Sequence, residues 1–113
     1  MWSKTISAAS TNLTQVKGGS GRIVGLFASN INAAARYLKF YDALSASVIV
    51  GTTVPTLTLM IPGGSTAGSG FFLNLPCDLD FSTGISFALT TGVADNDTGA
   101  VGASDIVVTV LYG

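Results

Sequence analysis

The stretch "SNINAAARYLKFYDA", residues 29–43, decides the fold class, because its composition suits a helix and its pattern suits a strand. Alanine, leucine, lysine and arginine lose little side-chain freedom in a helix, and Asn30 or Asn32 would serve as the N-cap. As a helix, however, the segment has only about three turns, and Leu38 and Tyr41 share a face with little else that is apolar. The helix remains the alternative interpretation.

A strand accounts for the same stretch better, because residues 36–41 alternate with a period of two. One side carries Arg36, Leu38 and Phe40, and the other carries Tyr37, Lys39 and Tyr41. Aromatic residues are frequent here, the flanking segments are also strand-like, and the sequence predicts no second helix against which a helix could pack. We therefore predict a strand that begins near Arg36, preceded by a tight connection in "NINAAA", residues 30–35.

Short runs of β-branched and aromatic residues recur along the rest of the chain, separated by clusters of Gly, Ser, Asn, Asp and Pro. This punctuation is typical of an all-β sandwich or barrel. The fold class that we predict is all-β, a single-domain antiparallel β-sandwich that is jelly-roll-like and has about eight strands. The candidate strands are 4–8, 13–17, 22–29, 35–42, 47–51, 56–61, 70–75, 85–91 and 105–112, of which one or two would be bends or loops.

The final candidate strand, "DIVVTVLY" at residues 105–112, is apolar on both faces apart from Thr109. Such a strand is central in its sheet or lies between the core and a neighbouring subunit. The glycine-rich stretches 62–70 and 91–105 are predicted surface loops, and the longer one is expected to bind something or to pack on a neighbour. We assign residues 22–113 to the β-sandwich domain and residues 1–21 to an N-terminal arm that could add a strand to an adjacent subunit.

The composition indicates a subunit of a larger protein assembly. A chain of 113 residues can bury enough surface to fold as one domain. Only 10% of its residues are charged, where an ordinary domain has about 25%, and 48% are apolar. With a net charge of −1, there is little repulsion between copies. We therefore expect much of the surface to be covered by copies of the chain or by a larger scaffold.

The sequence disfavours a nucleic-acid partner, a membrane-spanning helix and export by a signal peptide. The five Lys and Arg residues are scattered and balanced by aspartates, which argues against a nucleic-acid partner. The most apolar stretch, residues 47–63, is interrupted by Gly51 and Pro55 and falls short of the ~20 apolar residues of a membrane-spanning helix. The amino terminus has no apolar run of signal-peptide length, and a single cysteine, Cys77, fits a reducing compartment in which it would be a buried thiol.

The residues for catalysis or metal binding are few. The sequence contains no histidine and no glutamate, which removes the commonest proton shuttle and most paired-carboxylate sites. Asp78 and Asp80 would share one face of a strand, but we interpret them as turn formers that accept backbone N–H groups. Asp95 and Asp97 resemble the start of a calcium loop but lack its glycine and glutamate, so an Asx-turn is the prediction. We predict a protein that is not an enzyme, with no catalytic, cofactor-binding or metal-binding residues.

Exposed aromatic residues are the remaining candidates for function. On the outer face of a strand, tyrosine and tryptophan can stack on sugars, but they more often contact a partner protein or a neighbouring strand. The predicted partner interface consists of Trp2, Tyr37, Lys39, Tyr41, Asp95 and Asp97.

Three stretches, "NAAARYLKFYD", "GTTVPTLTLMIP" and "FSTGISFALTTGVADNDTGAVGASDIVVTVLYG", together resemble small structural proteins encoded among the virion genes of tailed bacteriophages and prophages. The likeness covers residues 24–113. That group has no diagnostic catalytic motif and includes capsid decoration, or cement, proteins, which sit on the outer shell and clamp neighbouring capsomers.

The resemblance implies a non-enzymatic virion subunit, assembled in the cytoplasm of the host bacterium. Its partners would be the major capsid protein or other virion proteins and further copies of itself, as a dimer or trimer. The alternative is a subunit of the neck, tail or fibre that acts as a carbohydrate-binding, receptor-binding or connector module.

Overall fold

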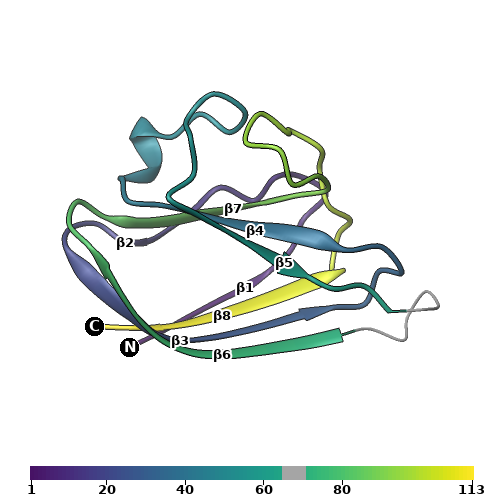
Figure 1. Ribbon diagram of the computed structural model, residues 1–113, viewed down its shortest axis with the longest axis horizontal. Helices are drawn as coiled ribbons and strands as arrows, with labels where there is room; N and C mark the ends of the chain where they lie inside the picture. Colours follow the sequence, from purple (N-terminus) through teal and green to yellow (C-terminus); the bar gives the residue numbers. More distant parts are fainter. Residues whose placement is uncertain (65–70) are drawn as a thin grey trace.

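The computed structural model describes the backbone of residues 1–64 and 71–113 and the side chains of residues 1–64 and 77–113. Within that part of the chain, eight strands form two four-stranded antiparallel sheets that pack as two layers (Figure 1). Sheet A has the strand order β1-β8-β3-β6, and sheet B has the order β2-β7-β4-β5. The elements are β1 (Trp2–Ile6), β2 (Thr14–Lys17), β3 (Gly21–Asn30), β4 (Arg36–Tyr41), the short 3-10 helix η1 (Ser45–Ser47), β5 (Leu57–Ile61), β6 (Phe71–Phe81), β7 (Ile85–Thr90) and β8 (Ile106–Tyr112). The predicted all-β sandwich is confirmed.

Strand pairing in the sandwich is nested: β1 pairs with β8, β2 with β7, β3 with β6 and β4 with β5. The first half of the chain therefore runs antiparallel to the second half, as one long double ribbon. Every connection crosses from one sheet to the other except that from β4 to β5. This is the strand order of a jelly roll, and it leaves β1 and β6 at the edges of sheet A and β2 and β5 at the edges of sheet B.

The stretch that decides the fold class is a strand, β4, which lies between β5 and β7. The helix alternative is wrong, and the tight connection before the strand is confirmed. Asn30 is fully buried, and its Nδ2 donates to the carbonyl oxygens of Ala34 and Ile61 at 3.1 and 3.3 Å. Its Oδ1 accepts the backbone N–H of Asn32 at 2.9 Å. The asparagine that would have capped a helix instead holds the turn against the end of β5.

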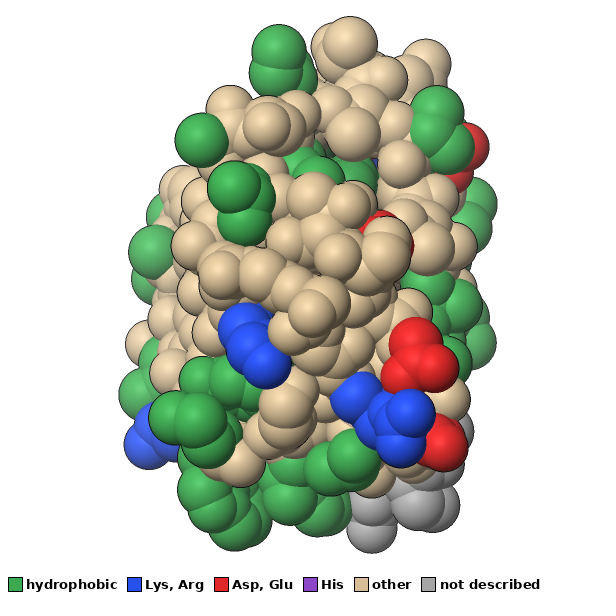
Figure 2. Space-filling model, turned by 90° about the vertical axis from the view of Figure 1, so that its left-hand side faces the viewer, with side chains coloured by type: hydrophobic (Ala, Val, Ile, Leu, Met, Phe, Trp, Pro, Cys, Tyr) green, Lys and Arg blue, Asp and Glu red, His purple; other side chains and the backbone are tan. Residues whose placement is uncertain are grey.

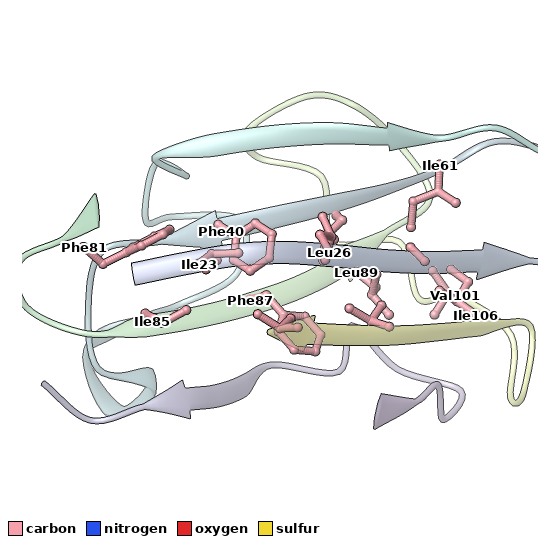
Figure 3. Packing of buried hydrophobic residues seen from close by; sticks show 14 residues of the cluster. Ile23, Leu26, Phe40, Ile61, Phe81, Ile85, Phe87, Leu89, Val101 and Ile106 are labelled. Carbon is pink, nitrogen blue, oxygen red and sulfur yellow. The ribbon is translucent and has the colours of Figure 1, made fainter. Parts of the chain in front are cut away.

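The core lies between the two sheets and is mostly aliphatic, with three phenylalanine side chains among its described buried residues (Figure 3). The Phe40 ring centroid is 6.1 Å from those of both Phe81 and Phe87, and the Phe40–Phe87 pair meets edge to face. The buried residues of this cluster are Ile23, Leu26, Ala28, Leu38, Phe40, Ile61, Phe81, Ile85, Phe87, Leu89, Val101, Ile106, Val108 and Val110. β7, which falls within the predicted strand 85–91, turns Ile85, Phe87 and Leu89 towards this core.

β8 is central in sheet A, between β1 and β3. This confirms the first of the two positions predicted for its apolar sequence. The predicted strand at 47–51 is wrong: η1 is followed by a turn in which Thr52 and Thr53 donate to the carbonyl of Ile49. Gly51 has a φ of 92°, which a continuing strand of L-residues would not allow.

β6 extends to Phe81, beyond the predicted 70–75, because an edge strand tolerates Pro76, which has no N–H to donate. The loop predicted at 62–70 falls partly outside the described residues, since 65–70 are not among them.

Residues 1–21, predicted to be an arm, supply an edge strand to each sheet of their own domain. β1 pairs with β8, and β2 pairs with β7. Both chain ends lie at the same end of the sandwich, where the amino group of Met1 donates to the carbonyl of Tyr112 at 2.7 Å (Figure 1). The N-terminal segment is thus integral to the sandwich.

Asp42, at the end of β4, fastens sheet B to the β6–β7 connection. Its carboxylate accepts the backbone N–H groups of Ser82, Thr83 and Gly84 at 3.0, 2.8 and 3.3 Å and the hydroxyl of Ser82 at 2.9 Å. These hydrogen bonds to the ionised form, those from the backbone of Ser82 and Thr83 above all, lower the pKa of Asp42 to about 2.

Candidate interaction surfaces

The outer face of sheet A is built from cross-strand rows, each with one residue from β1, one from β8 and one from β3. The rows are Trp2–Leu111–Gly25, Lys4–Thr109–Phe27 and Ile6–Val107–Ser29. Directly opposite residues in a sheet point to the same side, so these rows share the surface that faces away from the core. Within the three rows, Lys4 is the only charged residue.

This outer face of sheet A exposes large apolar side chains. Trp2 is 69% exposed and Ile6 53%, and Val24, at the β-bulge of β3, is 49% exposed. Figure 2 shows hydrophobic side chains gathered at the lower end of the molecule, which is the side of sheet A in Figure 1. Exposed apolar side chains that gather on one face of a small domain are typical of interaction sites, because leaving them in water is unfavourable.

Charged residues border this surface where β3 lies beside β6. The Nε of Arg22 lies 3.0 Å from Asp78 Oδ1 and 2.7 Å from Asp80 Oδ1. The two aspartates share one face of β6, as predicted, but their interpretation as turn formers is wrong. They lie within a strand and pair with an arginine that is distant in the sequence. These exposed ion pairs place fixed charge at the rim of the apolar surface.

The outer face of sheet B is covered by the chain itself. In Figure 1 the loops 42–56 and 91–105 lie over this sheet. Tyr41 is 1% exposed and packs with Val48 and Ala88, and Lys39 is fully buried. The two loops meet where Gly51 packs against Thr98, so closely that a side chain at Gly51 would collide with it.

Two polar side chains under this cover, those of Lys39 and Tyr41, differ in their hydrogen bonding. The Nζ of Lys39 donates to the carbonyl of Ala94 at 2.5 Å and so ties loop 91–105 to β4. The hydroxyl of Tyr41 has no hydrogen-bond partner among the described residues. Burial, with a smaller contribution from the negative charge of Asp95, raises the pKa of Tyr41. The arrangement holds this tyrosine in its neutral form.

The six residues predicted for one interface are divided between opposite sides of the sandwich. Trp2 lies on the outer face of sheet A, and Tyr37 is half-buried on the sheet B side beside Met60. Lys39 and Tyr41 have no exposed surface to offer a partner, because the loops cover them. Asp95 is exposed, whereas Asp97 forms the predicted Asx-turn by accepting the N–H of Gly99 at 2.8 Å.

Several exposed apolar residues were not identified from the sequence. On the side of sheet A these are Ile6 and Val24, and in the loops over sheet B they are Ile49, Val54 and Val93. The alternation of "WSKTI", which puts Trp2, Lys4 and Ile6 on the same face of a strand, was the signal available for Ile6. Val24 gave no such signal, because the bulge in β3 interrupts the alternation there.

Few groups in the described residues have the arrangement of a reactive site. No group of three or more metal-ligating side chains occurs within residues 1–64 and 77–113. Burial and the neighbouring Asp78 raise the pKa of Cys77, which disfavours its thiolate. In the part of the chain that the structure describes, no helix has the length and apolar character to span a membrane.

No protein-family model matches the chain, and a comparison with curated proteins gave no match.

Proposed function

We propose that the chain is a non-enzymatic structural protein of a bacteriophage virion, and specifically a capsid decoration protein that binds neighbouring capsomers. The observation that carries the proposal is the outer face of sheet A, an apolar sheet surface bordered by the ion pairs of Arg22 with Asp78 and Asp80. The resemblance of residues 24–113 to small virion proteins supports the same assignment. Such a subunit would act in the virion after assembly in the host bacterium.

The mechanism would be stabilisation by mass action. A protein that binds the assembled capsid lattice but not the separate capsomers shifts the equilibrium away from disassembly. Binding several neighbouring capsomers at once raises the effective affinity without new contacts. In this proposal the apolar outer face of sheet A seats on the major capsid protein, and the charges of Arg22, Asp78 and Asp80 fix its orientation at the rim.

The proposal is tested by binding the purified chain to particles assembled without it, measured by co-sedimentation and by cryo-electron microscopy. We expect ordered density at many lattice positions. Val24→Asp places a charge in the apolar surface, at the bulge of β3, and should weaken binding at least about tenfold, because the charge would be desolvated. Val93→Asp makes the same change in loop 91–105, on the opposite side, and should bind like the wild type.

Equal binding by both variants would contradict the assignment of the surface, and absence of the wild-type chain from all particles would contradict the function.

Trp2 favours a second candidate function, the neck, tail or fibre module that binds carbohydrate. Its indole is 69% exposed beside Lys4, and an open aromatic ring next to a hydrogen-bond donor suits stacking on a sugar. Density confined to the neck or tail, together with glycan binding that Trp2→Ala removes, would support this candidate over capsid decoration.

A further inference from the structure

Among the residues that the structure describes, β1 presents a row of backbone groups without partners along its free edge. Met1 and Tyr112 exchange two backbone hydrogen bonds, at 2.7 and 3.0 Å, and Ser7 donates to the carbonyl of Ile106 at 2.8 Å. Antiparallel pairs alternate between hydrogen-bonded and non-hydrogen-bonded positions, so Ser3 and Thr5 also point their N–H and C=O groups at β8. The backbone groups of Trp2, Lys4 and Ile6 therefore point away from the sheet.

The other three sheet edges carry features that hinder strand addition. β2 is four residues long and has a register shift between Gln15 and Lys17. β5 is bounded by Pro62, and β6 contains Pro76 and the exposed acidic residues. Prolines, bulges and like charges are the devices by which proteins protect an open edge from pairing. β1 has neither a proline nor a bulge, and Trp2 and Ile6 expose apolar side chains along it.

We propose that two copies of this chain pair through β1, antiparallel and about a two-fold axis at Ser3. The two A sheets would then form one continuous sheet of eight strands, with their outer faces on the same side. Around this axis, Trp2 of each copy is opposite Lys4 of the other, and the outward backbone groups of these residues exchange hydrogen bonds. Ser3 faces Ser3 of the second copy in a non-hydrogen-bonded pair.

Charge selects this register over the neighbouring one. An axis at Lys4 would place the two ammonium groups directly opposite each other, and like charges at such positions are destabilising. An axis at Ser3 instead places the ammonium group and aliphatic stem of each Lys4 against the indole ring of Trp2 in the other copy. This ring is 69% exposed in the single chain. Lys4 is thus repelled by Lys4 of the second copy in one register and attracted by its Trp2 in the other.

The pairing gives a structural form to the dimer that the resemblance to virion proteins implies, and only its role in capsid binding rests on the proposed function. A two-fold dimer would double the outer face of sheet A that is available for a capsid and so supply two linked contacts. The test uses the isolated protein. A monomer in solution would contradict the pairing and leave capsid binding to be judged by co-sedimentation.

The first experiment is sedimentation velocity of the wild type, Lys4→Pro and Lys4→Ala over a range of concentrations. We expect a monomer–dimer equilibrium in the wild type. Proline at position 4 removes an N–H that the β1–β8 ladder does not use, so the variant should keep its melting temperature while its dimer dissociation constant rises at least about tenfold. Lys4→Ala keeps the N–H and should dimerise more strongly than Lys4→Pro.

The second experiment tests the register by oxidative cross-linking in a Cys77→Ser background. Ser3→Cys should form an intermolecular disulfide, because its Cα atoms would lie about 4.5 Å apart across the axis. Lys4→Cys should not, because its Cα atoms would be more than about 7 Å apart.

A wild type that stays monomeric, a Lys4→Pro variant that dimerises like the wild type, or a cross-link at position 4 instead of position 3 would each overturn the proposal.

Discussion

At the scale of single residues, the sandwich depends on polar side chains that take over backbone hydrogen bonding at the turns. Asn30 does this before β4, and Asp42 does it after β4. Both residues bind backbone groups of segments distant in the chain, so each connects the two layers of the sandwich. Asp42 is also the carboxylate whose pKa the fold lowers to about 2.

Asp42→Asn should lower the free energy of unfolding near neutral pH by about 1 kcal/mol, because the side chain is partly solvated and its hydrogen bonds are screened. The folded pKa of Asp42 is about 2 and lies below its ordinary value of 3.8. The carboxylate therefore stabilises the fold fully above its ordinary pKa and loses that effect as the pH falls towards 2.

Chemical denaturation of wild type and Asp42→Asn at a series of pH values measures this difference, which should shrink on acidification. Asp95→Asn is the matched control, since Asp95 is exposed and outside this cluster. A difference between wild type and Asp42→Asn that does not change with pH would contradict the role given to the charge.

At the scale of elements, β4 shows how much the sequence could predict. Strict alternation over six residues and aromatic content were sufficient to identify the strand and its inward face. The fate of its other face was not predictable, because Lys39 and Tyr41 are buried by loops whose course depends on contacts such as that of Gly51 with Thr98. A local pattern specifies which side a residue faces, but not what comes to cover that side.

Other errors have the same physical origin. Val48, Ile49 and Val50 favour a strand by composition, but the hydrogen bonds of the threonines that follow close a turn. Asp78 and Asp80 suggested a turn, because their partner, Arg22, is contributed by another strand. The apolar outer face of sheet A likewise required the register of β1 and β3 against β8 before its rows could be assembled.

Lys39 connects β4 to loop 91–105, and its replacement by methionine tests that connection. Lys39→Met keeps the length of the side chain but removes the donor to Ala94. We expect the backbone N–H groups of Thr91 and Asp97, which donate within this loop, to exchange with solvent at least about tenfold faster. The core strands should be unaffected.

Hydrogen exchange measured by NMR gives these rates residue by residue. Lys4→Met is the control, because Lys4 is exposed on the other side of the sandwich. Unchanged exchange in loop 91–105 of Lys39→Met would mean that apolar packing alone holds the loop down.

At the scale of the whole molecule, the nested pairing makes most contacts non-local. The innermost pair, β4 with β5, is joined by a loop of moderate length, whereas β1 and β8 come from opposite ends of the chain. Folding rates fall as the sequence separation of contacts rises. We expect refolding from denaturant to take milliseconds to seconds, in the range of all-β sandwiches, as measured by stopped-flow fluorescence of the single Trp2. Refolding in microseconds would contradict this expectation.

The central position of β8 in sheet A also bears on biosynthesis. β8 follows the other seven described strands in the sequence, so β1 and β3 leave the ribosome before the strand that joins them, and the residues of sheet B that pack against Ile106, Val108 and Val110 stay uncovered until β8 has emerged. The sandwich therefore cannot be completed before β8 has been synthesised, and pairing of this seven-residue strand is the closing step of its folding. A nascent chain halted before Ile106 should be sensitive to protease and should bind chaperones, and a chain in which β8 has left the ribosome should show neither property.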